Sequence, residues 1–232
     1  MKRSLCIFIV LLLMLPSMAG CSGQTTVPDS QLELLIADAL SGKGRSILEG
    51  KSALEKAMKV GSLDHWEAEH SADPEAHLDS VYLHLFVSVP TGIFEFGLPC
   101  VYQYWRDSDT WTLVSQSELE ECGIVSYNED FFNSFVGSHS GSGYCRLTPC
   151  AWTVSVDEPD YNNCAVTVTY NLEVRPLSFG ASQPIYEDNT GTYEMNVGYD
   201  SISLAIPSDY ANELNVYYSV ANGLTLNSYS WG

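Results

Sequence analysis

The chain has 232 residues, with 10 Lys and Arg side chains against 29 Asp and Glu side chains, which gives a formal net charge of −19. A surface this acidic repels phosphate backbones, and the sequence has no basic stripe to offset the repulsion, so nucleic-acid binding is disfavoured. The length is sufficient for one large domain or two small ones with real cores.

The first twenty residues have the order of an export signal. Two basic residues, Lys2 and Arg3, precede an apolar run over residues 5–15, and a short segment containing small residues follows. The apolar run is too short to cross a bilayer core of about 30 Å as a helix. We therefore predict that residues 1–20 are a leader that the mature protein lacks.

The end of this leader, Met18-Ala19-Gly20-Cys21, resembles the lipobox of bacterial lipoproteins, in which the first position is usually leucine. The resemblance covers only the leader. It implies that the Cys21 thiol receives a diacylglyceryl group and that a type II signal peptidase cleaves before it. Two acyl chains hold a protein stably on a membrane. The chain is then anchored on the outer face of the cell membrane, or in the outer membrane of a Gram-negative host, and residues 21–30 are predicted to be a flexible tether.

Two helices are predicted after the tether. Residues 30–33 have the form of a capping box, and apolar residues recur at helical spacing over 31–40. A second helix is predicted over 46–60, although Gly50 weakens it.

Strand patterns begin at Asp79. Residues 79–89 alternate so that the valines and leucines face away from Tyr82, His84 and Phe86, which predicts a central strand. Residues 100–106 and 111–115, joined by a polar turn, predict a hairpin. A short helix is predicted around 129–135.

The glycine- and serine-rich segment 137–144 has the composition of a linker. We place a domain boundary there, between a domain at 31–136 and a β-rich domain at 145–232. Strands are predicted at 151–156, 165–174, 193–197 and 201–206, followed by a hairpin of 213–220 and 224–229 that turns at Asn222-Gly223.

The predicted fold class is α+β, with N-terminal helices packed on an antiparallel sheet and a mostly antiparallel β second domain. Residues 80–97 and 164–180 end in similar Phe-Gly motifs, each followed by a hairpin, so the sheets could be a tandem repeat of related units. In topology alone, the first half resembles the cystatin-like and nuclear transport factor 2-like folds.

Five cysteines remain besides Cys21 and the cysteine of the leader. In an exported chain they permit two disulfides and one unpaired thiol. Cys100 and Cys122 flank the predicted hairpin and are the first choice for a pair. A second disulfide would join two of Cys145, Cys150 and Cys164. Buried thiols are the alternative if the host lives without oxygen.

Aromatic residues of the predicted hairpin suggest a ligand platform made of Tyr102, Tyr104 and Trp111. Exposed Tyr and Trp side chains on a sheet can stack on sugar rings or fill a partner's pocket. The alternative is that these side chains pack in the core and in cross-strand pairs.

Two polar segments contain side chains of the kinds that bind metals. His65, His70 and His77 lie in an acidic segment, but their spacing does not fit a metalloprotease helix. Residues 157–163 gather oxygen ligands of the kind that calcium binds, without the spacing of an EF-hand. A solvated connector and an acidic turn explain both, so we expect no metal, cofactor or catalytic residue.

Together these features favour a non-enzymatic, lipid-anchored binding or structural module with an unknown protein or carbohydrate ligand. The alternative is an extracellular hydrolase acting on glycan or peptide. A hydrolase would need a concave site with converging carboxylates or a histidine of shifted pKa.

Overall fold

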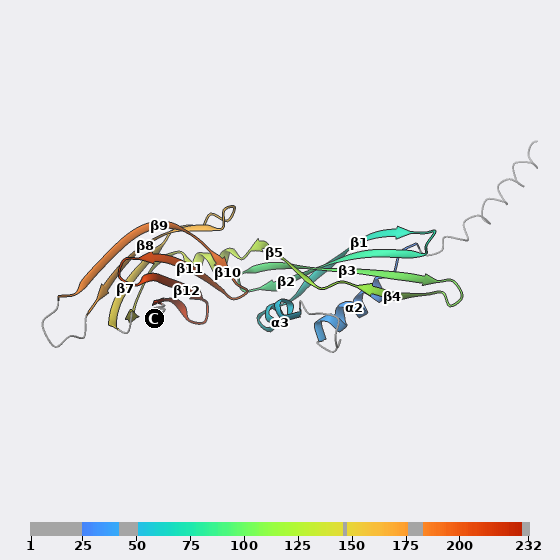
Figure 1. The fold of residues 1–232 in the computed structure, drawn as a ribbon, viewed down its shortest axis with the longest axis horizontal. Helices are drawn as coiled ribbons and strands as arrows, with labels where there is room; N and C mark the ends of the chain where they lie inside the picture. The colour runs from blue at the N-terminus through green and yellow to red at the C-terminus, as the bar shows by residue number, and fades with distance from the viewer. Residues whose placement is uncertain (1–24, 42–50, 146–147, 176–182, 229–232) are drawn as a thin grey trace, which may run out of the picture. The chain divides into compact units, whose positions relative to one another are not determined.

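The computed structural model describes residues 25–41, 51–145, 148–175 and 183–228 (Figure 1). This described chain is 63% strand, with thirteen strands in three antiparallel sheets and only three short helices. The prediction of an α+β fold with helices packed on a sheet is therefore wrong. So is the prediction of two tandem sheet units, because the strands form three sheets.

The helices are α2 (Asp29–Ser41), α3 (Lys51–Val60) and α4 (Glu129–Phe135). The strands are β1 (Ser62–Asp73), β2 (Leu78–Val89), β3 (Gly92–Trp105), β4 (Thr110–Gln116), β5 (Glu120–Tyr127), β6 (Gly137–Cys145), β7 (Thr148–Val156), β8 (Ala165–Val174), β9 (Ile185–Glu194), β10 (Asn196–Val197), β11 (Ser201–Ser208), β12 (Asn212–Ser219) and β13 (Gly223–Ser228).

The first two helices lie where the apolar spacing predicts them, within the described residues. α2 buries Leu32, Ile36 and Ala39, and α3 buries Leu54 and Ala57. Both helices are short, at 13 and 10 residues, so burial of these side chains rather than intrinsic propensity stabilises them. No helix among the described residues is long and apolar enough to cross a membrane.

The chain divides into two compact units, which we describe separately. Unit 1 contains Met1–Lys51, Trp66–Leu85 and Gly97–Glu120, and unit 2 contains Ser52–His65, Phe86–Phe96 and Glu121–Gly232. These bounds differ from the predicted domains at 31–136 and 145–232. The segment expected to be a linker, 137–144, belongs to strand β6, which pairs with β7 along its whole length.

Strands β1 to β5 form one sheet in the order β1-β2-β3-β4, with β5 also paired to β3. The alternation predicted for 79–89 is confirmed: odd-numbered residues from Asp79 to Val89 are buried, whereas Tyr82, His84 and Phe86 are only half-buried. The predicted hairpin is also confirmed, since β3 pairs with β4 across the turn that follows Trp105.

Unit 2 contains a sandwich of two four-stranded sheets, β6-β7-β8-β9 and β10-β11-β12-β13 (Figure 1). Both sheets contribute to a single hydrophobic core. The strands predicted at 151–156, 165–174 and 201–206 and the closing hairpin are confirmed within the described residues. Core side chains at the centre of the two sheets include Val154, Val168 and Leu172 from the first and Leu204, Leu214 and Val216 from the second.

The short helix α4 joins this core through phenylalanines. Asn128 caps the helix by accepting a hydrogen bond from the backbone N–H of Asp130. Phe131 and Phe135 are buried, and each ring centroid lies 5.4 Å from that of Tyr218 in β12. A helix of seven residues is not stable alone, so these contacts hold the predicted helix at 129–135 in place.

Glu187 in β9 connects the two sheets of the sandwich. One carboxylate oxygen accepts hydrogen bonds from the Tyr170 hydroxyl at 2.6 Å and the Asp209 backbone N–H at 2.9 Å. The other accepts from the Ser208 hydroxyl at 2.9 Å and the Tyr210 backbone N–H at 3.2 Å. Tyr170 and Glu187 lie in one sheet. Ser208 is the last residue of β11 in the second sheet, and Asp209 and Tyr210 follow it, so the carboxylate clamps the sheets together.

The same contacts determine the pKa of the Glu187 carboxyl group. Burial alone would raise the pKa of Glu187, but the hydrogen bonds from Tyr170, Ser208, Asp209 and Tyr210 outweigh burial and lower it. A carboxylate whose pKa is lowered by folding stabilises the fold above its unfolded pKa of about 4.3. That stabilisation is lost as the pH falls through the folded pKa.

We predict that Glu187→Gln lowers the free energy of unfolding at pH 7 by about 1–3 kcal/mol, because an amide nitrogen cannot accept the hydrogen bonds that one carboxylate oxygen accepts. Chemical denaturation at several pH values measures this difference. The difference in free energy of unfolding between wild type and variant should become smaller below about pH 4. Glu194→Gln, a substitution at an exposed position of the same strand, is the control. An equal loss of unfolding free energy in both variants would contradict the proposed role of Glu187 in joining the sheets.

Candidate ligand-binding face

The outer face of the sheet β6-β7-β8-β9 is built of polar rows that cross all four strands. The pairing registers align Ser142, Ala151, Glu173 and Tyr186 in one row. They align Ser140, Thr153, Asn171 and Asp188 in the next. The residues between these rows, such as Trp152 and Leu172, are buried, because successive side chains of a strand point to opposite faces.

A shallow hollow of about 590 Å³ lies over these two rows. We call it the outer trough; its lining is Ser140, Gly141, Ser142, Ala151, Trp152, Thr153, Asn171, Leu172, Glu173, Tyr186, Glu187 and Asp188. Gly141 is required here, because a Cβ atom at this position would lie 2.4 Å from the Trp152 ring. The absence of a side chain at Gly141 thus makes room for Trp152, whose own indole is almost fully buried.

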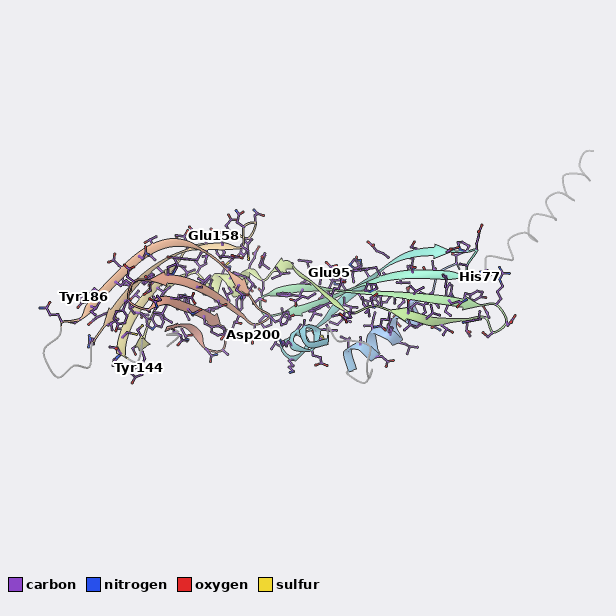
Figure 2. All side chains as sticks on the ribbon, in the orientation of Figure 1. His77, Glu95, Tyr144, Glu158, Tyr186 and Asp200 are labelled. Carbon is purple, nitrogen blue, oxygen red and sulfur yellow. The ribbon has the colours of Figure 1, made fainter. Side chains whose placement is uncertain are left out.

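Two exposed tyrosines lie near one end of the sandwich, where Figure 2 labels them. Tyr186 is 71% exposed and Tyr144 is 68% exposed. Only Tyr186 lines the outer trough. A large aromatic ring left in water beside a polar hollow is available to stack on a flat apolar surface of a ligand.

The charges around the trough are acidic, and several are already paired. Glu173 forms an ion pair with Arg175, with 2.8 Å between the Oε1 and Nε atoms, and Glu187 is committed to the clamp. Asp188 adds a further exposed carboxylate. The trough therefore offers hydrogen-bond acceptors and hydroxyls to a neutral ligand and repels an anionic one.

Hydroxyl groups extend this face beyond the trough. Thr167 and Thr169 of β8 lie opposite Thr192 and Thr190 of β9, and each pair of hydroxyl oxygens is 3.0 Å apart. The hydroxyls of each pair hydrogen-bond to each other, and they continue the polar rows along the outer face of the sheet.

Unit 1 has a smaller hollow of about 330 Å³ over β1 to β4, lined partly by His70, Tyr82 and Cys100. The partly exposed His70 contacts a buried carboxylate: its Nδ1 atom lies 2.8 Å from Oδ2 of the fully buried Asp79. The same oxygen accepts a hydrogen bond from the Val27 backbone N–H at 2.9 Å. Asp79 thus fixes the beginning of the described chain to β2.

This His-Asp pair resembles an acid-base arrangement, but the thiol near it is poorly reactive. Burial, followed by the negative charge of Asp79, raises the pKa of Cys100 to about 11. The Cys100 thiol donates to the Val81 carbonyl oxygen, at 3.5 Å, and stays protonated at neutral pH. The geometry of unit 1 therefore favours a structural role for His70 and Asp79.

Of the predicted platform of Tyr102, Tyr104 and Trp111, two residues lie in the core. Tyr102 and Trp111 are buried, with 3% and 6% exposure, so neither offers a free ring face. Tyr104 packs against Trp111 at 5.3 Å between ring centroids and donates its hydroxyl to Asp109 at 2.6 Å. Cross-strand packing, the alternative, explains these side chains.

The cysteines lie in different surroundings, and Cys21 is outside the described residues. Cys100 is buried as above, Cys122 is exposed on β5, and Cys164 donates to the Met195 carbonyl oxygen at 3.3 Å. The Cys100–Cys122 disulfide stays a prediction. The thiols of Cys145 and Cys150, both buried, are brought together with 3.2 Å between their sulfur atoms.

His65 and His70 lie on strand β1, and His77 lies in the turn between β1 and β2. His65 stacks on Phe86 with 4.3 Å between ring centroids, whereas His70 contacts Asp79. In the loop 157–163, the side chain and backbone of Asn163, together with the Asn162 backbone, donate to Asp160 and lower its pKa. Among the described residues, no three His, Cys, Asp or Glu side chains are grouped as metal ligands.

Sequence reasoning missed the trough because its exposed aromatic residue lies in a segment without an apolar pattern. Residues 185–192 carry Tyr186 and Asp188 among polar neighbours, and no strand was predicted there. Alternation of Thr190 and Thr192 is the one signal that could have indicated a strand.

Comparison with known proteins adds no relative: no family model, curated protein or solved structure matches the chain.

Proposed function

We propose that the chain is a lipid-anchored, non-enzymatic module that binds a neutral carbohydrate on the outer trough of unit 2. The observation that carries the proposal is the exposed Tyr186 ring at the edge of a hollow lined by Asn171, Asp188 and hydroxyl side chains. Sugars present apolar C–H faces and many hydroxyls, so they need both kinds of contact.

The shape and charge of the trough support this class of ligand. The hollow is open and lies on a rigid sheet, which suits a chain of sugar units lying across the strands. Its carboxylates disfavour phosphate, sulfate and uronic-acid groups by charge repulsion. Affinity should be modest, because a single stacked ring contributes about 0.5–1.5 kcal/mol beyond its burial.

The membrane anchor is supported by the lipobox resemblance at Cys21 and by the start of the described chain. Val27 is buried and hydrogen-bonded to Asp79, and α2 begins at Asp29. The predicted tether at 21–30 is therefore shortened to the residues before Val27. Five residues separate Cys21 from Val27, so the extended chain reaches at most about 20 Å, and unit 1 would be held near the membrane.

A hydrolase is the alternative function. It would act through the hollow of unit 1, where His70 contacts the buried Asp79. Analysis of the glycan after incubation separates the two functions, because a binding module returns the oligosaccharide uncut.

We predict that Tyr186→Ala weakens binding to a neutral oligosaccharide by about twofold to tenfold, because the stacking contact is lost. A glycan array identifies the oligosaccharide, and calorimetry with the chain from Cys21, carrying Cys21→Ser to remove the lipid, measures the affinity.

Tyr144→Ala is the matched control, since Tyr144 is about as exposed but does not line the trough. Equal loss in both variants, or no bound glycan on the array, would overturn the carbohydrate proposal.

The anchor is tested by mass spectrometry of the full chain extracted from membranes of expressing cells. We expect an N-terminal tryptic peptide from Cys21 to Lys43 that carries the mass of a diacylglyceryl group. Cys21→Ser should abolish this modification and Cys6→Ser, a change within the leader, should not. Recovery of an unmodified Cys21, or of a mature chain that begins elsewhere, would refute the anchor.

A further inference from the structure

Two cysteines meet at the end of the β6–β7 hairpin. Cys145 is the last residue of β6, and Cys150 is the third residue of β7. Their sulfur atoms lie 3.2 Å apart, and both side chains are almost fully buried, at 1% and 5% exposure. Because the two thiols are this close on the inner face of one hairpin, their side chains contact each other directly in the core.

The register explains why they meet. Cys145 is paired with Thr148 and Cys150 with Gly143, so the two cysteines are diagonal neighbours on the same face of the hairpin. Their sulfur atoms are about 1 Å farther apart than in a disulfide, where the S–S bond is about 2.05 Å. Gly143 has no side chain, and a Cβ atom there would meet no atom within 4 Å. The space beside Cys150 therefore allows a small adjustment.

We propose that Cys145 and Cys150 form a disulfide that closes the β6–β7 hairpin when the chain meets a disulfide oxidant. The thiolate of one cysteine attacks a sulfur atom of the oxidant and releases one thiol. The second cysteine then attacks the mixed disulfide and releases the other thiol. One S–S bond forms in the chain and one breaks in the oxidant, and the two cysteine protons pass to the released thiols.

The other described cysteines have different contacts. Cys100 donates to the Val81 carbonyl oxygen in unit 1, and Cys164 donates to the Met195 carbonyl oxygen. The Cys145–Cys150 pair is the one that the structure brings within reach of bond formation. Because both sulfurs are buried, the bond should form while the hairpin folds, before the core excludes the oxidant.

This disulfide would lie on the inner face of the sheet whose outer face carries the outer trough. Cys150 precedes Ala151, which belongs to the same row as Tyr186. Closing the hairpin would fix the strands β6 and β7 at that end of the trough. The disulfide stands independently of the carbohydrate and of the lipid anchor, because it rests on the geometry of the two thiols alone.

The sequence provides a direct test, because Arg146 lies between the two cysteines and Glu129 and Glu158 flank them. The chain is refolded with a mixture of reduced and oxidised glutathione, alkylated in denaturant and digested after Lys, Arg and Glu. Peptide 130–146 contains only Cys145, and peptide 147–158 contains only Cys150.

We expect the two peptides to be recovered as one disulfide-linked species. Its mass should be about 2 Da below the summed masses of the two unmodified peptides, and reduction should separate it into these peptides. Cys100→Ser should leave the linked species in place, and Cys145→Ser should remove it. The wild-type digest needs no variant to fold. Recovery of both peptides as separate alkylated species from the oxidised chain, or linkage of either one to another cysteine, would overturn the proposal.

Discussion

The shared core of the sandwich in unit 2 is the constraint on which its remaining features depend. Side chains such as Val154 and Leu172 from one sheet and Leu204 and Val216 from the other are withdrawn from water together. Since successive residues of a strand point to opposite faces, this burial fixes which residues face outward. The polar rows of the outer trough are thus determined by what the inner face must bury.

The trough and the stability of the sandwich are linked through strand β9. Glu187 points toward the other sheet and clamps it, while its neighbours Tyr186 and Asp188 point outward into the trough. A strand held firmly on its inner side presents its outer side chains in fixed positions, which lowers the entropic cost of binding a ligand. The closed hairpin proposed for Cys145 and Cys150 would stiffen the opposite edge of the same sheet.

Sequence patterns predicted the elements whose faces differ in polarity. The alternation at 79–89, the hairpin after Cys100 and the helices of the first sixty residues were found because apolar residues recur at a clear period. Strands β1, β6 and β9 were missed because few of their positions are apolar. The less exposed positions of β6 and β9 include Gly141, Gly143 and Glu187, so no apolar period appears. The Gly-Ser alternation of β6 has the composition of a linker, and only pairing with β7 shows it to be a strand.

The site was less predictable than the fold. Tyr102 and Trp111 have the residue types of a ligand platform but are buried, whereas Tyr186 stands in a polar segment and is exposed. Residue type alone cannot distinguish these cases, since exposure depends on which face the opposite sheet covers. The trough is assembled from four successive strands, and its rows exist only after the pairing registers are set.

The measurement that tests the central claim most directly is a two-dimensional NMR titration of the lipid-free chain with a neutral oligosaccharide. If the outer trough is the ligand surface, backbone signals of Asn171, Glu173, Tyr186 and Asp188 should shift together and saturate with one affinity. Signals around the unit 1 hollow, such as those of Ser80, Ser115 and Ser117, should stay unchanged. Shifts confined to that hollow, or none in the trough, would contradict the account.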